Sequence, residues 1–197
     1  MPRYPRFESP TKVYHFINRG VNKKKLFHRP EDFRFYKDLI FEYKERFRID
    51  IYHYCLMINH THLLLRAEEA VLLSRFAHFI QRRYAYYYCK TYHWSEQVFR
   101  KRFISISVEN DGQFLECGRY IERNPLDAKL VEKIEDYPHT SYPHYAHNKP
   151  DFLVTLSPLF DTLGRSLEER RAVYYFYVNQ VRNYEIPGPV KEELATF

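Results

Sequence analysis

The stretch Asn59-His60-Thr61-His62, followed by Leu63-Leu64-Leu65, sets the centre of the predicted fold. The apolar run is typical of a β-strand, and along a strand the side chains at i and i+2 point to the same face. Both imidazoles can therefore reach one metal ion from one side of a sheet. A His-x-His pair also arises by chance or through core packing, so other parts of the chain must supply further ligands if it binds metal.

The residues around this pair predict a hairpin of two strands. Residues 49–57 form a β-branched and aromatic run, Ile58-Asn59 interrupts it, and residues 60–66 form the next strand. Consecutive strands with a tight link pair antiparallel. Thr61 is expected to point into the layer opposite the histidines, where its hydroxyl needs a hydrogen-bond partner.

The periodicity of apolar residues predicts five more elements: a strand over 13–17, a helix over 31–47, a helix over 70–92, a strand over 103–108 and a helix over 112–123. Pro125 is expected to end the last of these, because proline disfavours helical geometry at Asn124 and has no N–H to donate. The order β-α-β-β-α-β-α matches the split β-α-β plan. We therefore predict an α+β, ferredoxin-like fold with an antiparallel sheet.

Composition divides the chain of 197 residues into three predicted parts. Residues 1–11 are rich in proline and form an N-terminal arm, residues 12–145 form the domain, and residues 146–197 form an extension with one amphipathic helix over about 167–184. Hydrophobic residues make up 45% of the chain, enough for a sizeable core. This excludes a disordered or low-complexity protein.

The charge predicts an anionic partner. The net charge is +6, the pI is about 9.1, and the basic residues cluster at 23–25, 82–83 and 100–102. Nucleic acid is the first candidate, and a solvated basic surface is the alternative. Many of the 19 tyrosines must lie in the core, but those interleaved with Arg and Lys suit stacking on unpaired bases.

The cysteines and the N-terminus predict a cytoplasmic location. Cys55, Cys89 and Cys117 are far apart and form no CxxC pair, which fits a reducing compartment. The first residues have no apolar signal core, and no stretch approaches the roughly 20 apolar residues of a membrane span.

The helix over 112–123 brings two further groups into the prediction. Tyr120 and Asn124 are four residues apart, so they share a helix face. A phenolic oxygen can act as a covalent nucleophile, and an amide oxygen can bind a hard cation. Two imidazoles and one amide oxygen leave open positions on Mg²⁺ or Mn²⁺ for a phosphate. The spacing alone leaves open that Tyr120 is a packed aromatic and Asn124 a helix C-cap.

Six segments carry a resemblance to a known family: 18–22 (NRGVN), 57–65 (MINHTHLLL), 99–103 (FRKRF), 119–125 (RYIERNP), 128–131 (AKLV) and 137–142 (YPHTSY). In this order they resemble the single-tyrosine transposases of the HUH superfamily. More particularly they resemble the REP-associated tyrosine transposases, relatives of the insertion-sequence-200 type. The resemblance covers roughly residues 12–145 and implies the fold already predicted.

The resemblance implies an enzyme that cuts and rejoins single-stranded DNA. His60, His62 and Asn124 would hold one Mg²⁺ or Mn²⁺, which polarises a phosphodiester. Tyr120 would attack in line and become a 5′-phosphotyrosine, freeing a 3′-hydroxyl. Attack by another 3′-hydroxyl would rejoin the strands without ATP. A phenol has a pKa near 10 and must lose its proton during attack, and the sequence identifies no base.

The expected partner is single-stranded DNA that carries a hairpin, bound by a monomer or a homodimer. Nine basic residues are expected to contact its phosphates, with plain surface charge as the alternative for each: Arg19, Lys23, Lys24, Lys25, Arg82, Arg83, Arg100, Lys101 and Arg102. Trp94 is expected either to stack on a base or to anchor its loop.

Departures from the family pattern affect the expected DNA specificity, while the metal and nucleophile positions are all present; two other functions remain open. Thr61 replaces an apolar residue, Ile58 a proline, and His139 a tryptophan. The first alternative is a domesticated relative that holds hairpin DNA or RNA without cutting. The second is a metal-dependent hydrolase that uses the histidines with water, so that Tyr120 is dispensable. Five other tyrosines are rival nucleophiles by number, but none has Asn or Gln four residues later: Tyr84, Tyr86, Tyr87, Tyr88 and Tyr92.

Overall fold

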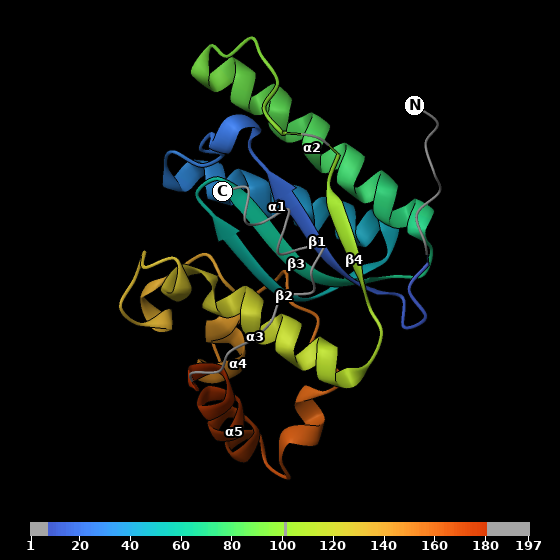
Figure 1. Ribbon diagram of the computed structural model, residues 1–197, viewed down its shortest axis with the longest axis vertical. Coiled ribbons are helices and arrows are strands. Elements are labelled where there is room, and N and C mark those ends of the chain that lie inside the picture. Colours follow the sequence, from blue (N-terminus) through green and yellow to red (C-terminus); the bar gives the residue numbers. More distant parts are fainter. Residues whose placement is uncertain (1–7, 101, 181–197) are drawn as a thin grey trace.

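A computed structural model describes residues 8–100 and 102–180 of the chain (Figure 1). Its centre is a four-stranded antiparallel sheet in the order β2-β3-β1-β4. The strands are β1 (Val13–Arg19), β2 (Ile49–Met57), β3 (His60–Ala67) and β4 (Ile104–Val108). β3 inserts between β1 and β2, which is the split β-α-β arrangement. The predicted ferredoxin-like fold and antiparallel sheet are confirmed.

Helices cover both faces of this sheet. α1 (Pro30–Phe47) and α2 (Ala70–Tyr92) pack on one face, where their apolar residues meet Phe16, Leu63 and Leu65. α3 (Asp111–Asp127) packs on the other face, and α4 (Tyr142–His147) and α5 (Leu167–Asn179) lie beyond it (Figure 1). Three 3₁₀ turns lie at Val21–Lys23, Ile134–Asp136 and Phe160–Leu163.

The register of β1 and β3 decides which side chains face α3. Ile17 pairs with His62 and Arg19 with His60, and paired residues point to the same face. Thr61 points the other way, as predicted from strand alternation. It is fully buried, and its hydroxyl lies 3.4 Å from the hydroxyl of Tyr36 on α1.

α3 does not end before Pro125, so that prediction is wrong. The helix continues to Asp127, and the backbone N–H of Ala128 still donates to the carbonyl of Asn124 at 2.9 Å. Because proline has no N–H, the helix lacks the hydrogen bond that residue 125 would donate. Burial of the Pro125 ring offsets part of the free-energy cost of this loss. The chain turns away at Lys129, whose φ of 56° is left-handed. Asn124 is therefore an interior residue of the helix and not its cap.

Two other predicted boundaries differ by more than one residue. β1 runs to Arg19, beyond the predicted 13–17, because its pairing with β3 continues. α5 ends at Asn179, where Gln180 becomes extended, although the pattern predicted a helix to 184, and residues 181–184 lie outside the described part. The division into arm, domain and extension stays a prediction. Within the described ranges, no helix is long and apolar enough to cross a membrane.

Candidate active site

Three histidines meet between the sheet and α3. His60 and His62 project from β3, and their ring centroids are 4.8 Å apart. His15 projects from β1, and its Nε2 lies 2.8 Å from Nδ1 of His62. All three rings are buried, and strand alternation places them on the face that α3 covers.

His62 is arranged as a metal ligand would be. Its Nδ1 is engaged by His15, while its Nε2 is buried and has no hydrogen-bond partner within the described residues. When Nδ1–H donates to His15, Nε2 keeps a free lone pair, and buried polar atoms are seldom left without a partner. A metal-binding histidine is commonly oriented by a hydrogen bond of this kind at its other nitrogen.

Burial keeps these imidazoles neutral at pH 7. It lowers the pKa of His60 to about 4, with a further lowering by the charge of Arg19 and an opposing effect of a hydrogen bond with Asn124. Burial also lowers the pKa of His62 well below its ordinary value, and that of His15 to about 3. Neutral imidazole is the form that binds metal.

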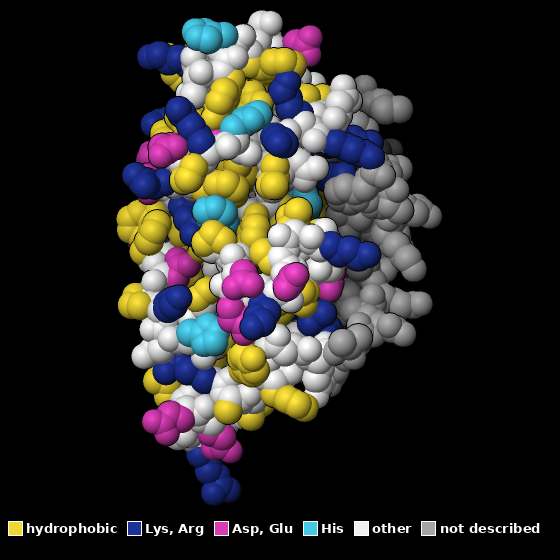
Figure 2. Space-filling model, turned by 90° about the vertical axis from the view of Figure 1, so that its left-hand side faces the viewer, with side chains coloured by type: hydrophobic (Ala, Val, Ile, Leu, Met, Phe, Trp, Pro, Cys, Tyr) yellow, Lys and Arg dark blue, Asp and Glu magenta, His cyan; other side chains and the backbone are white. Residues whose placement is uncertain are grey.

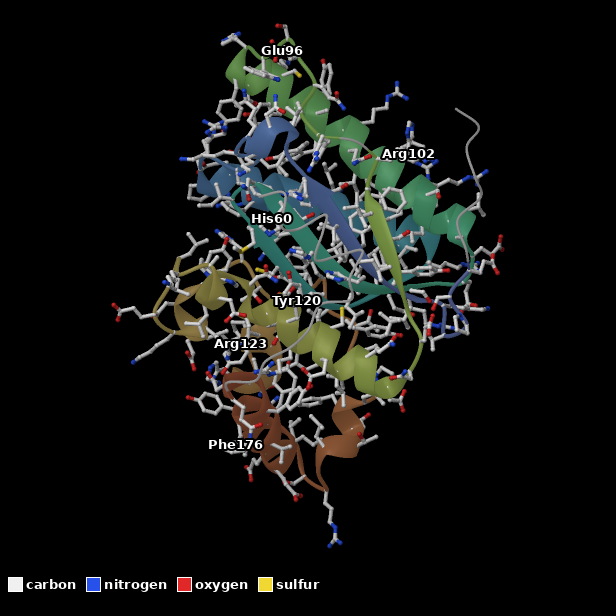
Figure 3. The ribbon with its side chains drawn as sticks, in the orientation of Figure 1. His60, Glu96, Arg102, Tyr120, Arg123 and Phe176 are labelled. Carbon is white, nitrogen blue, oxygen red and sulfur yellow. The ribbon has the colours of Figure 1, made fainter. Side chains whose placement is uncertain are left out.

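α3 brings Tyr120 and Asn124 to the same place. Tyr120 is half-buried, and its ring centroid lies 5.7 Å from that of His62 and 5.9 Å from that of His15. Asn124 bonds with the His60 side chain, and its Nδ2 donates to the carbonyl of Tyr120 at 2.9 Å. Figure 3 shows Tyr120 on α3 below His60. The structure therefore brings the four predicted site residues together.

A glycine allows α3 to come this close to the sheet. A Cβ atom on Gly118 would lie 2.8 Å from Cδ2 of His53 on β2, closer than real contacts allow. His53 cannot easily yield, because its Nδ1 lies 3.0 Å from Oε1 of Glu122 and its ring stacks on Tyr145 at 4.7 Å. Gly118 thus sets the distance between Tyr120 and the histidines.

A buried polar network fixes α3 to the C-terminal helices. Glu122 is fully buried and accepts hydrogen bonds from Ser141 at 2.6 Å and from Tyr174 of α5 at 2.5 Å. Arg119 donates to the carbonyl of Tyr177, and Arg123 donates to a further carbonyl near the end of α5. Figure 3 shows Arg123 on the side of α3 that faces α5. The helix that carries Tyr120 is therefore held from both sides.

Seven of the nine predicted phosphate contacts divide into three groups. Arg19 pairs with His60 across the sheet and lies beside the site. The exposed residues of the neighbouring loops form the second group: Lys23, Lys25, Arg100 and Arg102. Arg82 and Arg83 lie on α2, on the other side of the sheet, so the structure does not bring them to Tyr120. Lys101 lies outside the described residues.

The structure also shows the surroundings of Trp94 and of the five rival tyrosines. Lys24 sits over the ring of Trp94, with Nζ 2.7 Å from the ring centroid, so Trp94 packs against the basic segment that follows Val21–Lys23. The rival tyrosines of α2 anchor the segment before α1: the Tyr84 hydroxyl donates to the carbonyl of Leu26, and those of Tyr87 and Tyr92 donate to Asp32. Tyr86 alone of the five is mostly exposed, and it lies on the wrong face of the sheet for this site.

Sequence reasoning missed His15. The signal was present, because His15 is a polar residue in an alternating apolar strand, at the position that shares a face with Val13 and Ile17. Its contact with His62 depends on the β1–β3 register, which the sequence does not state. Among the described residues, no group of three His, Cys, Asp or Glu side chains is arranged to hold a metal ion. Asn124, whose amide bonds with the His60 side chain, is of another residue type.

A family model described as "Transposase IS200 like" matches residues 10–124, more than half of the chain. The chain belongs to the IS200-like transposase family. The match includes β1, β3 and α3 up to Asn124, and therefore all the site residues described above. Membership of this family identifies the protein as a transposase, as the resemblance predicted.

The chain is also similar to solved structures. The chain is similar to a REP-associated tyrosine transposase bound to a REP hairpin, with a TM-score of 0.64 and 15% identity over 80% of this chain and 93% of that one. At this identity the likeness shows the fold. A chain from Deinococcus radiodurans R1, described provisionally as a transposase, matches with a TM-score of 0.43 and 16% identity over 69% of this chain and 98% of that one. No curated protein matches significantly.

Proposed function

We propose that this transposase cuts and rejoins single-stranded DNA at a hairpin through a tyrosine nucleophile. One observation carries the proposal: Tyr120 lies edge-on to His62 at 5.7 Å between ring centroids and one helical turn before Asn124, which bonds with His60. A nucleophile and a set of cation ligands thus occupy one site, as transfer of a phosphodiester requires.

The Tyr120 hydroxyl is the nucleophile in this proposal. Its oxygen forms a bond to phosphorus while the bond to the 3′ oxygen breaks, so that the products are a 5′-phosphotyrosine and a free 3′-hydroxyl. The phenolic proton leaves during attack, since an ordinary phenol is protonated at pH 7. The reverse reaction with another 3′-hydroxyl rejoins strands and conserves the number of phosphodiester bonds.

His60, His62 and Asn124 would hold a divalent cation, Mg²⁺ or Mn²⁺. The donor set fits such an ion, because His62 Nε2 is an orphaned buried lone pair and the Asn124 amide lies against His60. A cation bound there would supply charge neutralisation at the scissile phosphate. Arg19, beside His60, is placed to bind the same phosphate.

Single-stranded DNA with a hairpin is the proposed substrate. The support is the net charge of +6, the exposed basic loops next to the site, and family membership. The similar solved structure was determined with a REP hairpin bound. A domesticated protein that only holds the hairpin is the second candidate, and its support is the same basic surface.

The test is incubation of the full chain with single-stranded hairpin oligonucleotides and Mn²⁺, followed by a denaturing gel. Wild type should give a covalent protein–DNA adduct, and Tyr120→Phe or added EDTA should abolish it. The matched control is Tyr137→Phe, because Tyr137 bonds to the Leu56 carbonyl and not to the site. Cleavage that persists in Tyr120→Phe would favour a hydrolase, and binding without cleavage by wild type would favour the hairpin-holding protein.

A further inference from the structure

The outer face of α2 carries cations and aromatic rings in alternation. Its residues follow one another at steps of three or four: Arg75, Phe79, Arg82, Tyr86 and Lys90. Residues at these steps form a single stripe along a helix. The helix Ala70–Tyr92 contains no Asp or Glu, so no acid on α2 neutralises the stripe.

The stripe borders a groove between α1 and α2. The groove has a volume of about 610 Å³ and seven lining residues: Glu42, Tyr43, Arg46, Phe79, Arg82, Arg83 and Tyr86. Phe79 and Tyr43 stack at 5.3 Å between ring centroids and form an aromatic floor. The guanidinium of Arg46 lies 5.0 Å from the Phe79 ring, so cationic and aromatic groups adjoin within the groove itself.

Acidic side chains neutralise only part of the positive charge of the groove. Its one acid, Glu42, lies 3.9 Å from Arg83, which also donates to the Tyr43 hydroxyl at 3.3 Å. Arg46 and Arg82 are exposed and form no ion pair within the described part of the chain. Tyr86 is 70% exposed, an unusual state for a large aromatic side chain. The guanidinium groups of Arg46 and Arg82 and the exposed ring of Tyr86 are therefore available to a ligand.

This combination fits a strand of unpaired nucleotides. Arginines suit the phosphates, and exposed aromatic rings suit the faces of the bases. Residues 75 to 90 span roughly 22 Å at 1.5 Å per residue, which is longer than a single nucleotide needs. Figure 2 views the side of the molecule where α1 begins and α2 ends, and its upper half shows Lys and Arg side chains interleaved with hydrophobic ones.

The sheet separates this groove from the proposed cleavage site. α1 and α2 cover one face, whereas His60, His62 and Tyr120 lie between the sheet and α3. We propose that the groove between α1 and α2 is a second binding site for single-stranded DNA, distinct from the site where Tyr120 acts. It would hold a flanking segment or a second strand, and it does not require the protein to cleave DNA.

Fluorescence anisotropy of a labelled oligonucleotide of 20 thymidines tests this site. The full chain carries Tyr120→Phe in every sample, so that cleavage plays no part. The double substitution Arg82→Ala with Tyr86→Ala should weaken binding about tenfold, and each lost arginine–phosphate contact should reduce the salt slope by about 0.7. The matched control is Arg165→Ala with Tyr175→Ala, an exposed pair of the same residue types outside the groove.

A second measurement does not depend on whether the double variant folds. In it, the same oligonucleotide is cross-linked by ultraviolet light to protein whose α2 is unsubstituted, and the cross-links are mapped by mass spectrometry. Cross-links on the peptide that contains Phe79 and Tyr86 are expected. Unchanged affinity in the double variant, or cross-links confined to other peptides, would overturn the proposal. Failure of wild type to form a covalent adduct would count against the proposed function alone.

Discussion

At the scale of single residues, His15 shows how a side chain can matter without touching substrate. Its Nε2 lies 2.8 Å from Nδ1 of His62, and no other hydrogen-bond partner of the His62 ring is found among the described residues. A hydrogen bond at one imidazole nitrogen fixes the orientation and tautomer of the other. We therefore assign His15 the role of positioning His62.

Replacing His15 with alanine should weaken Mn²⁺ binding by about 10- to 100-fold, because His62 would lose the group that orients it. Isothermal titration calorimetry of the DNA-free protein measures this directly. His15→Gln, which keeps an acceptor, should recover part of the affinity, and exposed His78→Ala should bind as wild type does. An unchanged dissociation constant in His15→Ala would show that His62 needs no such partner.

His139 gives a prediction about pH. Its ring stacks on Phe33 at 3.6 Å between centroids, and burial, followed by the charge of Lys37, lowers its pKa to about 4. The unfolded chain binds a proton below about pH 6.5 while the folded chain does not, so stability is lost as the pH falls from 6.5 toward 4.

His139→Phe should therefore reduce the loss of unfolding free energy between pH 7 and pH 5 by about 1 kcal/mol relative to wild type, since Phe keeps the stacking and cannot titrate, and solvent near the partly exposed ring weakens the effect. Urea denaturation at the two pH values measures the difference. The same pH dependence in both proteins would mean that His139 is protonated equally in the folded and unfolded chains.

At the scale of elements, the docking of α3 on β2 determines the geometry of the site. Gly118 allows the close approach, and the His53–Glu122 pair holds it. Gly118 and Glu122 lie within one turn of Tyr120 on α3, and His53 lies opposite Gly118 on β2. Substitutions here should therefore alter the position of Tyr120 as well as stability.

Gly118→Ala should destabilise the protein by about 1–3 kcal/mol through overpacking, despite the better helix propensity of alanine. Adduct formation should fall further than the folded fraction does, because α3 moves away from the histidines. The control Gly112→Ala lies in the first turn of the same helix, where a Cβ meets only the Asn110 side chain at 3.3 Å. If both variants keep wild-type activity, the distance set by Gly118 is unimportant.

Glu122→Ala should cost about 3–5 kcal/mol, since it leaves His53, Ser141 and Tyr174 buried without their shared partner. Thermal unfolding followed by circular dichroism measures this, with exposed Glu132→Ala as the comparison. A loss below about 1 kcal/mol would show that the network contributes little to the attachment of α5 to α3.

At the scale of the whole molecule, the sequence predicts the fold better than it predicts the surroundings of the site. Alternation along residues 60–66 correctly places Thr61 opposite the histidines, and helical spacing correctly places Tyr120 with Asn124. These are local periodicities, which a sequence displays directly. His15 was missed because its partner is 47 residues away and depends on strand register.

Local rules also fail where tertiary packing opposes them. Pro125 lies inside α3 because the helix is buried against β2 and gains more from packing than it loses in one hydrogen bond. The separation of Arg82 from the histidines is likewise invisible in the sequence, since it depends on which face of the sheet α2 covers.

We propose that Tyr120 becomes covalently joined to the DNA. The most direct measurement is mass spectrometric mapping of the peptide that remains joined to a nucleotide after wild type reacts with a hairpin oligonucleotide and Mn²⁺. We expect one modified peptide, with the phosphate on Tyr120 and a free 3′-hydroxyl on the released strand. A nucleotide joined to another residue, such as the exposed Tyr86, or cleavage without any joined peptide, would contradict it.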